Sequence, residues 1–361
     1  MSINLMYQYI LEEKELLLNN IETKDDFIKT IALKIKKDIK HVYIIGSGTS
    51  YHTGLAAKNF MEKTSNWTVD CLAPTHFLQS TQVNPEESIV IGISQSGKSI
   101  STLDGLRKAI DNGFYTIAMS EYSNSDLSNI ADSFVPIRVG EREQSGAKTK
   151  GYVAAVLNLI MLSLEYSHQH SIINKRTYIK QLTNIKKSIQ NMNLIFDKSE
   201  VWVQKVKSDF KKANNIMIVG YGANYATALE GGLKLLETVR IPVSGYEMEE
   251  FMHGIYNCIN EDSFLIFLQG PDALKEEENI KRINLLKDFL NKVTDNCFLI
   301  GKGENISKNN LKIDFVNDNL LSVFEYIIPL QLLSAVVSNE KNINPDNSKF
   351  PTFHQQMKSK L

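Results

Sequence analysis

Three serines, a glutamine and a glycine lie together in the stretch Ser94-Gln-Ser-Gly-Lys-Ser99, directly after an aliphatic run at residues 89–93. A short apolar run that ends in a glycine turn is typical of a buried parallel strand, and the helix after such a strand begins with unpaired backbone amides. Hydroxyls and amides around a glycine suit a phosphate monoester, and Lys98 adds positive charge. The alternative is an ordinary serine N-cap, although one cap needs only one hydroxyl. The stretch favours a phosphate site.

A second set of reactive side chains is Glu230, Lys234 and Glu237, at positions i, i+4 and i+7. This spacing places carboxylates and an ammonium on one face of a helix, from which they can project together into a cleft. A carboxylate with a tuned pKa can act as a general base that moves a proton between two carbons. By spacing alone, a solvated helix face of paired charges is the more common arrangement.

The composition is that of a globular protein with room for two domains: 361 residues, of which 43% are hydrophobic and 22% charged. The formal net charge is -1, so no global field attracts nucleic acid or an anionic membrane. The apolar run at 153–164 is too short to span a bilayer and the amino terminus lacks a secretory signal, which predicts a cytoplasmic protein. Three widely spaced cysteines indicate core residues rather than a disulfide framework or a metal site.

Residues 3–40 carry apolar side chains at helical spacing and predict two helices. From residue 41 onward the pattern changes to short β-branched runs, each followed by a turn and a helix-like stretch. Strands that alternate with helices predict an α/β fold with a parallel sheet covered on both faces. The predicted strands cover 41–45, 88–93, 115–119 and 134–138, and the predicted helices cover 51–64, 99–112, 124–131 and 147–167.

The second half of the chain repeats the first at an offset of 174 residues. Residues 44–55 lie over residues 218–229, with both glycines, a tyrosine, a threonine and a leucine in common. We therefore expect two tandem α/β sandwiches joined by helices across 171–212, with a single domain and a fortuitous match as the alternative. Strand-like runs at 263–268 and 296–300 and a helix at 323–338 complete the second copy.

The repeat provides an internal control for the phosphate site. In the second copy the run 263–268 leads into Gln269-Gly-Pro-Asp272, which lacks the hydroxyl cluster, so we expect one phosphate site per chain, in the first copy. The turn Gly46-Ser-Gly48 invites comparison with dinucleotide-binding folds. Tyr51, however, occupies the place of the third glycine in G-x-G-x-x-G, which argues against nicotinamide binding.

Five ordered motifs across nearly the whole chain resemble those of the double sugar isomerase (SIS) domain family. The nearest kinds are the isomerase half of glucosamine-6-phosphate synthase, the stand-alone phosphosugar isomerases and the fructosamine-phosphate deglycases. The motifs are Gly48-Thr-Ser-Tyr51, Ser94-Gln-Ser-Gly97, Ala228-Leu-Glu-Gly-Gly-Leu-Lys-Leu-Leu-Glu237, His253-Gly254 and Pro329-Leu-Gln-Leu-Leu333.

The resemblance implies two tandem SIS domains, each a flavodoxin-like αβα sandwich with a parallel sheet flanked by helices. The expected boundaries are N-terminal helices at 1–40, a phosphate-binding SIS domain at 41–170, linking helices at 171–212, a second SIS domain at 213–338 and a tail at 339–361 that closes the active site.

The resemblance also implies a sugar phosphate as ligand. Glu237 would be the base that moves a proton between C1 and C2, with Lys234 among the substrate-binding residues. His253, sixteen residues beyond Glu237, would help to open the sugar ring in the site of a neighbouring subunit, since the family is usually dimeric. The chemistry requires no metal and no organic cofactor. His168 and His170 have no partner motif and are interpreted as surface residues. The phosphate would be held by Ser94, Gln95, Ser96 and Ser99, with Gly48, Thr49 and Ser50 beside it.

The sequence departs from the family pattern in three places. Lys148 stands in the loop 145–150 where the synthase contacts its sugar, and Lys98 replaces a glutamate, so positive charge is added around the ligand. Glu143 either contacts sugar hydroxyls or a substrate amine, or it is an ordinary acid at the start of a helix. The family closes its site with a tail lysine, for which the best candidate is Lys358, followed by Lys349 and His354; an inert tail is the alternative.

These features lead to an expected function. Only about forty residues precede the first copy, so no glutaminase domain with an early cysteine nucleophile is expected. The favoured reaction is therefore catabolic: deglycation of a fructosamine 6-phosphate, or deamination with isomerisation of an amino-sugar phosphate. Simple aldose/ketose isomerisation is the main enzymatic alternative. A sugar-phosphate sensor is the other class, but a sensor acting on DNA would carry a basic helix-turn-helix segment, and residues 1–40 are balanced in charge and too short for one.

Overall fold

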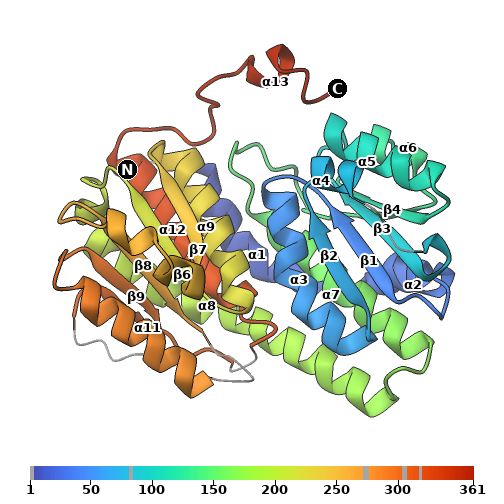
Figure 1. The fold of residues 1–361 in the computed structure, drawn as a ribbon, viewed down its shortest axis with the longest axis horizontal. Helices are drawn as coiled ribbons and strands as arrows, with labels where there is room; N and C mark the ends of the chain where they lie inside the picture. The colour runs from blue at the N-terminus through green and yellow to red at the C-terminus, as the bar shows by residue number, and fades with distance from the viewer. Residues whose placement is uncertain (1–3, 81–83, 271–275, 303–306, 317–318) are drawn as a thin grey trace. The chain divides into compact units, whose positions relative to one another are not determined.

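The computed structural model describes residues 4–80, 84–270, 276–302, 307–316 and 319–361. Its contacts divide the chain into two compact units, each of which contains one copy of the repeat (Figure 1). The first fourteen residues group with the second copy and the last fourteen with the first. The first-copy unit comprises residues 15–143, 150–183 and 348–361, and the second-copy unit comprises residues 1–14, 144–149 and 184–347.

The first-copy unit is built on a parallel sheet of five strands in the order β2-β1-β3-β4-β5. All six residues of β3 are buried, because the strand is central and helices cover both faces of the sheet, and this explains its uninterrupted aliphatic sequence. The sheet confirms the predicted α/β class and the four predicted strands. The strands are β1 (His41–Ile45), β2 (Thr68–Leu72), β3 (Ser88–Ile93), β4 (Tyr115–Ser120) and β5 (Ser133–Pro136).

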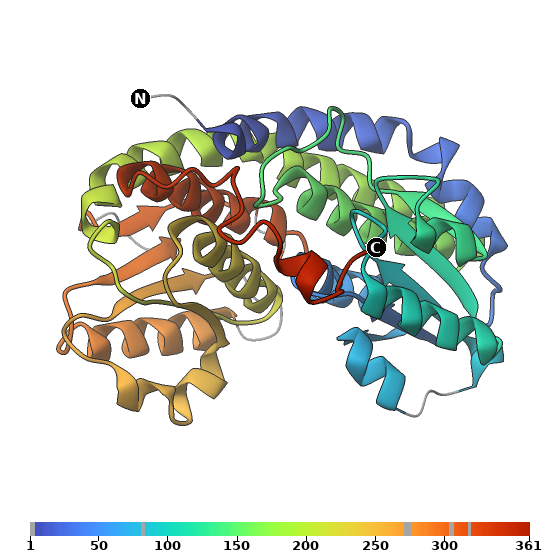
Figure 2. The same cartoon turned by 90° about the horizontal axis from the view of Figure 1, so that it is seen from above.

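Two helical layers cover this sheet (Figures 1 and 2). α7 is apolar around its whole circumference and all but two of its residues are buried, as expected for a helix enclosed by neighbours. On the opposite face, Leu103 and Leu106 form a core cluster with Tyr43 and Val90. The first layer contains α2 (Ile28–Lys34), α3 (Thr49–Ser65) and α7 (Lys150–Gln169), and the second contains α4 (Pro74–Gln79), α5 (Ile100–Asp111) and α6 (Asp126–Ile130).

The second-copy unit has a parallel sheet in the order β10-β9-β8-β6-β7, which is the same topology. α9 (Ala223–Val239) and α12 (Val323–Glu340) pack together on one face. On the other face, α10 (Met248–Met252) and α11 (Glu276–Leu290) contribute Phe251 and Ile283 to the core. The strands are β6 (Ile216–Gly220), β7 (Val243–Glu247), β8 (Phe264–Gln269), β9 (Cys297–Gly301) and β10 (Asn310–Lys312). Helices α1 (Leu5–Glu22) and α8 (Lys175–Phe210) contribute residues to both units.

The repeat extends through an entire helix in each copy. α3 and α9 each contain 17 residues. Each follows a glycine with a positive φ, Gly48 (φ 56°) and Gly222 (φ 57°), and each ends at a left-handed residue, Asn66 and Arg240, both with φ 60°. The offset between these positions is 174 at both ends of the helix, which confirms the two tandem copies.

Three strands were not predicted, and the linker differs from the expectation. β2, β7 and β10 lie at the edges of their sheets, and only one residue of each is buried, so they lack the apolar run of a central strand. Residues 171–212, expected to hold several helices, contain the single continuous helix α8.

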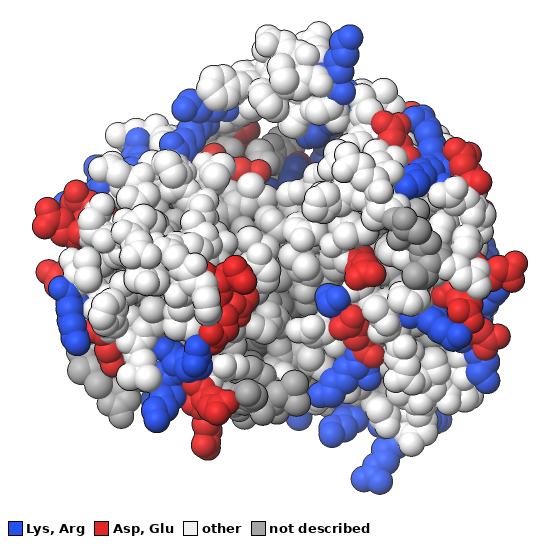
Figure 3. Space-filling view, in the orientation of Figure 1, with Lys and Arg blue, Asp and Glu red and all other residues white. Residues whose placement is uncertain are grey.

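Across the described ranges, none of the helices has the length and apolar character needed to cross a membrane. On the face shown in Figure 3, acidic and basic side chains are interspersed rather than separated by sign. This surface agrees with the nearly balanced charge of the sequence.

Candidate active site

The loops after β1 and β3 lie side by side in the first-copy unit, because these two strands are neighbours in the sheet. The strand order reverses between them, and ligands of such sheets bind at the carboxyl ends of the strands at this point. A Cβ on Gly46 would lie 2.8 Å from Cβ of Ser50 and 3.2 Å from the carbonyl oxygen of Ile93. Glycine here therefore lets the start of α3, with Gly48, Thr49 and Ser50, approach the end of β3.

The loop at residues 94–99 makes a tight turn around Gly97. This glycine has φ +67°, and a Cβ on it would lie 2.2 Å from Ser125, so both backbone and packing require glycine. The Gly97 amide donates to the Ser94 carbonyl (2.8 Å), and the Gly97 carbonyl accepts from the Leu127 amide (3.1 Å). The turn is thus held on both sides of its glycine.

The 94–99 loop presents several donors. Within the described part of the chain, the backbone amides of Gln95, Ser96 and Ser99 make no hydrogen bond. Ser99 precedes α5, yet its side chain makes no capping bond, so the serine N-cap alternative is not what the structure shows. Three amides and the neighbouring hydroxyls around one glycine turn suit a small anion.

Glu143 is buried, and both of its carboxylate oxygens accept hydrogen bonds. Oε1 accepts from the Lys150 amide (2.9 Å), and Oε2 accepts from the Gly151 amide (3.0 Å) and from Nε2 of Gln95 (3.1 Å). Glu143 therefore binds the first two amides of α7, as the helix-start alternative expects, while a contact to a sugar or an amine stays a prediction. Lys148 is half-buried in the segment 144–149, which groups with the second-copy unit.

The end of the chain pairs with the 94–99 loop (Figure 2). The Ile100 amide donates to the Ser359 carbonyl (3.2 Å), and the Leu361 amide donates to the Lys98 carbonyl (3.0 Å). Ser99 and Lys360 form an antiparallel bridge between these two bonds. The last three residues are therefore attached to the first-copy unit by main-chain hydrogen bonds.

Of the three tail candidates, Lys358 directly precedes this paired segment and is exposed, with a left-handed φ of 47°. Nδ1 of His354 lies 2.8 Å from Oγ of Ser359. Burial and the nearby Lys360 lower the pKa of His354. The ammonium of Lys349 lies 5.4 Å from the ring centre of Phe350. Of the three, Lys358 is therefore the candidate that adjoins the segment paired with the 94–99 loop.

α9 carries the second set of reactive side chains, and glycines let it pack closely. A Cβ on Gly231 would lie 2.2 Å from Cδ1 of Leu330 on α12, and a Cβ on Gly245 of β7 would lie 2.5 Å from the backbone of Ala228. Glycine is unfavourable in a helix interior, so the glycine at 231 needs such a reason. Close packing of α9 between α12 and β7 supplies it.

Lys234 lies between two carboxylates of α9. Its Nζ is 3.3 Å from Oε1 of Glu230 and 2.8 Å from Oε2 of Glu237. The side chains of Lys234 and Glu230 are 1% exposed, whereas that of Glu237 is 37% exposed. Burial lowers the pKa of Lys234, but attraction to both carboxylates outweighs burial and raises this pKa above its usual range. The ammonium stays charged, and Glu237 is the member of the group that a ligand can reach.

His253 follows α10, whose start is capped by Glu247. The Glu247 carboxylate accepts from the amides of Glu249 (2.6 Å) and Glu250 (3.1 Å). Nδ1 of His253 lies 2.8 Å from the Glu249 carbonyl oxygen, and the residue is exposed. Because a carbonyl only accepts, Nδ1 carries the hydrogen, and Nε2 of the neutral ring is an acceptor.

Glu237 and His253 lie toward opposite ends of strand β7 in the second-copy unit. α9 begins after the carboxyl end of β6 and runs back, so Glu237 in its last turn is near the amino end of β7. His253 follows the carboxyl end of β7. These two ends of β7 are about 13 Å apart at the usual rise per residue of a strand. The two side chains therefore do not converge within one unit.

The matching crevice of the second copy is filled by the chain itself. Nδ2 of Asn224 lies only 2.0 Å from where a Cβ of Gly270 would stand, and the Tyr221 hydroxyl donates to the Gly270 carbonyl (2.6 Å). Gln269 is buried, with Nε2 bound to Asn284 (2.8 Å). Pro271 and Asp272, which end the stretch Gln269-Gly-Pro-Asp272, lie outside the described residues. These contacts support a phosphate site in the first copy.

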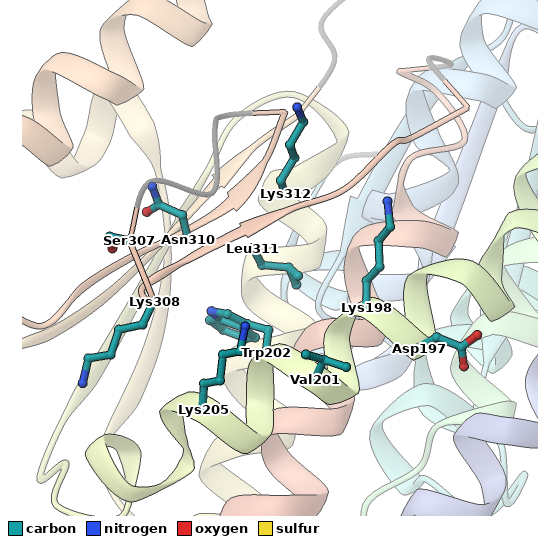
Figure 4. A pocket seen from close by; sticks show the side chains of 10 residues that line it. All are labelled: Asp197, Lys198, Val201, Trp202, Lys205, Ser307, Lys308, Asn310, Leu311 and Lys312. Carbon is teal, nitrogen blue, oxygen red and sulfur yellow. The ribbon is translucent and has the colours of Figure 1, made fainter.

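A cavity of about 670 Å³ opens in the second-copy unit between α8 and β10 (Figure 4). None of the candidate site residues lines it. Two of its lysines are already paired with acids: Lys198 with Asp314 and Lys308 with Asp209, both at 2.7 Å. This cavity is separate from the motif residues and is not part of the candidate site.

Three supporting residues were not predicted from the sequence. Gly151 lies against the Gln95 side chain, and Oε2 of Glu121 is 3.4 Å from Nε2 of Gln95. Glu247 caps the helix that ends at His253. The available signal for Gly151 is a glycine at the start of a long apolar helix, and the signal for Glu247 is an acid just before a short helix.

A model of the SIS domain matches residues 36–164 and 209–288 of this chain. The chain is 26% identical over 347 residues to glutamine–fructose-6-phosphate aminotransferase (isomerizing) of Caldanaerobacter subterraneus subsp. tengcongensis, covering 94% of this chain and 54% of that protein. It is 28% identical over 353 residues to the protein of the same name from Clostridium tetani, covering 95% and 55%. The chain thus spans about half the length of these curated relatives.

Two solved structures are similar over nearly their whole length. A proposed phosphosugar isomerase from Clostridium difficile 630 has a TM-score of 0.91 and 31% identity, covering 100% of this chain and 99% of that one. A proposed sugar-binding protein from Salmonella typhimurium LT2 has a TM-score of 0.81 and 32% identity, covering 92% and 100%. The family model covers more than half of the chain, with one matched segment in each copy of the repeat. The chain therefore belongs to the SIS domain family.

Proposed function

We propose that this chain is an enzyme that binds a sugar 6-phosphate and moves a proton between C1 and C2 of its open-chain form. The observation that carries the proposal is the α9 group, in which the buried ammonium of Lys234 holds the partly exposed carboxylate of Glu237 at 2.8 Å. One accessible carboxylate beside a fixed cation is an arrangement suited to a general base.

The phosphate is assigned to the first copy. The unpaired amides of Gln95, Ser96 and Ser99, with the hydroxyls of Ser50 and Ser94, supply neutral donors at the carboxyl ends of β1 and β3. Lys98 and the tail lysine Lys358 add positive charge along the chain near these donors. Lys358 is proposed to complete the site, because it directly precedes the segment that pairs with the 94–99 loop.

His253 is proposed to act in the site of a neighbouring subunit. In its own chain, His253 lies toward the end of β7 that is opposite to Glu237, so a single chain does not bring the two side chains together. A two-fold symmetric dimer would place each His253 in the partner's site, because such an interface exchanges the same residues in both directions. A homodimer with shared sites follows.

The favoured substrate is an amino-sugar or fructosamine 6-phosphate, with a deglycase or a deaminase/isomerase reaction. The curated relatives are named as isomerizing glutamine–fructose-6-phosphate aminotransferases, and the chain matches about half of their length. Simple aldose/ketose isomerisation is the second candidate, favoured by the Clostridium difficile relative, which is named as a phosphosugar isomerase. The Salmonella relative is named for sugar binding, which supports a non-catalytic sensor as the third.

The test incubates the purified protein with fructosamine 6-phosphates, glucosamine 6-phosphate and fructose 6-phosphate and follows released amine and sugar phosphate. Glu237→Gln is the test variant, and Asp209→Asn, which changes a partly exposed, ion-paired carboxylate of the same unit, is the matched control. Amine release that is lost only in Glu237→Gln supports a deglycase or deaminase. Isomerisation without amine release indicates the plain isomerase. Binding without turnover of any of these compounds contradicts an enzymatic role and supports the sensor.

A further inference from the structure

We infer that Glu143 is a positioning residue for the 94–99 loop: bound to the first two amides of α7, its carboxylate holds the side chain of Gln95, for which Gly151 leaves the space. The inference rests on the proposed function, because it concerns the loop to which the phosphate is assigned. It also gives the Gln95 side chain a structural task in place of a direct contact to phosphate.

The Gln95 side chain is turned toward two acids. Its Nε2 lies 3.1 Å from Oε2 of Glu143 and 3.4 Å from Oε2 of Glu121. A carboxylate only accepts, so both hydrogens of this amide group face carboxylates. Phosphate oxygens are also acceptors, and the side chain has no third hydrogen to offer them. Gln95 can therefore serve a phosphate through its backbone amide.

Gly151 provides the room for this arrangement. A Cβ on Gly151 would lie 2.2 Å from Oε1, 2.4 Å from Cδ and 2.5 Å from Nε2 of Gln95. The amide plane of Gln95 thus rests directly on the first turn of α7. Any side chain at position 151 would displace the end of Gln95, which is flexible, while α7 itself would keep its place.

Glu143 connects the loop to a rigid element. Its side chain is 2% exposed, and the same carboxylate that meets Gln95 accepts from the first two amides of α7. A helix amino terminus stabilises negative charge, so this acid is compensated although it lies next to an anion site. On the other side, the Glu121 amide donates to the Gln95 carbonyl (2.9 Å). Gln95 is therefore fixed through its main chain near β4 and through its side chain at α7.

The test variant is Gly151→Ala, which improves helix propensity and removes the space for Gln95. Two readouts apply: amide hydrogen exchange of Gly97 and Glu121 in the ligand-free protein, and the Kd for fructose 6-phosphate by calorimetry. Both amides are hydrogen bonded to carbonyls of the 94–99 loop. We expect an unchanged or higher Tm, at least about tenfold faster exchange of these amides, and at least about tenfold weaker binding.

Gln95→Met supplies a second variant, because it keeps the length of the side chain and removes its donors. If both changes act through the same contact, the double variant binds no more weakly than either single one. The control is Glu165→Gln on the same helix. Glu165 is also buried, but it pairs with Lys24 at 3.0 Å, away from the loop. It should lower Tm while leaving loop exchange and Kd unchanged.

The inference would be overturned if amide exchange and Kd of Gly151→Ala equal those of the wild type. It would also be overturned if Gly151→Ala binds more tightly because Gln95 is freed. A wild-type protein that binds neither fructose 6-phosphate nor inorganic phosphate would instead refute the proposed phosphate site. The exchange measurement still decides the role of Glu143 in that case, since it is made without ligand: the positioning role survives only if exchange is faster in Gly151→Ala and in Glu143→Gln, but not in Glu165→Gln.

Discussion

The ammonium of Lys234 lies 2.8 Å from the carboxylate of Glu237, with only 1% of the lysine side chain exposed to solvent. On its other side, at 3.3 Å, lies the equally buried Glu230. One cation thus serves two acids with different tasks: it neutralises Glu230 inside the unit and orients Glu237 at the surface. The stability of the fold and the proposed chemistry therefore depend on the same lysine.

Replacing Lys234 by methionine is expected to lower the free energy of unfolding by about 3–5 kcal/mol, because it removes the ammonium beside a buried carboxylate. Urea denaturation measures the change. The control is Lys198→Met, whose partner Asp314 is 70% exposed. Loss of that surface pair should change the free energy of unfolding by less than about 1 kcal/mol. Equal effects of the two substitutions would contradict the buried role of Lys234.

The pH dependence of this effect has a definite sign. The pKa of Lys234 is raised in the folded state, because the attraction of two carboxylates exceeds the opposing effect of burial. Its contribution to stability is then complete below the unfolded pKa of about 10.4 and is lost only as the pH rises past the folded value. The difference in unfolding free energy between wild type and Lys234→Met should therefore not shrink between about pH 6 and about pH 9. A difference that shrinks within this range would argue against the ion group.

Two adjacent glycines of α9 should respond in opposite ways to alanine. Gly231→Ala places a Cβ 2.2 Å from Leu330 and is expected to destabilise the protein by about 1–3 kcal/mol through overpacking. In Gly232→Ala the nearest atom would be 3.4 Å away, an ordinary contact, so the higher helix propensity of alanine should leave stability unchanged or raised. Thermal unfolding of both variants distinguishes the cases. A tolerated Gly231→Ala would contradict the close approach of α9 to α12.

Mixing two inactive variants should restore activity if the sites are shared between subunits. Glu237→Gln and His253→Ala each inactivate their own homodimer. A mixed dimer has one site with Glu237 from one chain and His253 from the other, so random exchange restores about a quarter of the wild-type activity. The assay follows turnover after co-refolding of the two variants. Absence of recovery, with mixed dimers shown to form, would place His253 in the site of its own chain or outside catalysis.

One of the three cysteines should react with a thiol reagent in the native protein. Burial raises the pKa of both the Cys71 and the Cys297 thiol to about 12, and the thiolate is the reactive form. Cys258 is exposed. Titration with Ellman's reagent at about pH 8 should therefore count one thiol in the native state and all three in denaturant. In Cys258→Ser the native count should fall to zero, and a remaining fast thiol would contradict the burial of the other two.

The sequence alone identified the features that depend on residues close together along the chain. The buried strand β3 appears as an uninterrupted apolar run, the 94–99 loop as a glycine turn rich in hydroxyls, and the α9 group as charges spaced by one and two helical turns. The tandem repeat is equally visible, because the same glycines recur at a fixed offset. These patterns are local consequences of strand and helix geometry, so they can be read without the fold.

Tertiary structure decided what depends on contacts between distant residues. Edge strands β2 and β7 carry no strong apolar pattern, because only one residue of each is buried. The pairing of Lys360 with Ser99, and the meeting of Glu143 with Gln95 over Gly151, join segments that are far apart in sequence. Spacing could place Glu230, Lys234 and Glu237 on one face but could not tell a solvated face from a buried ion group. That distinction depends on which helix and strand cover α9, and it is made only when the chain is folded.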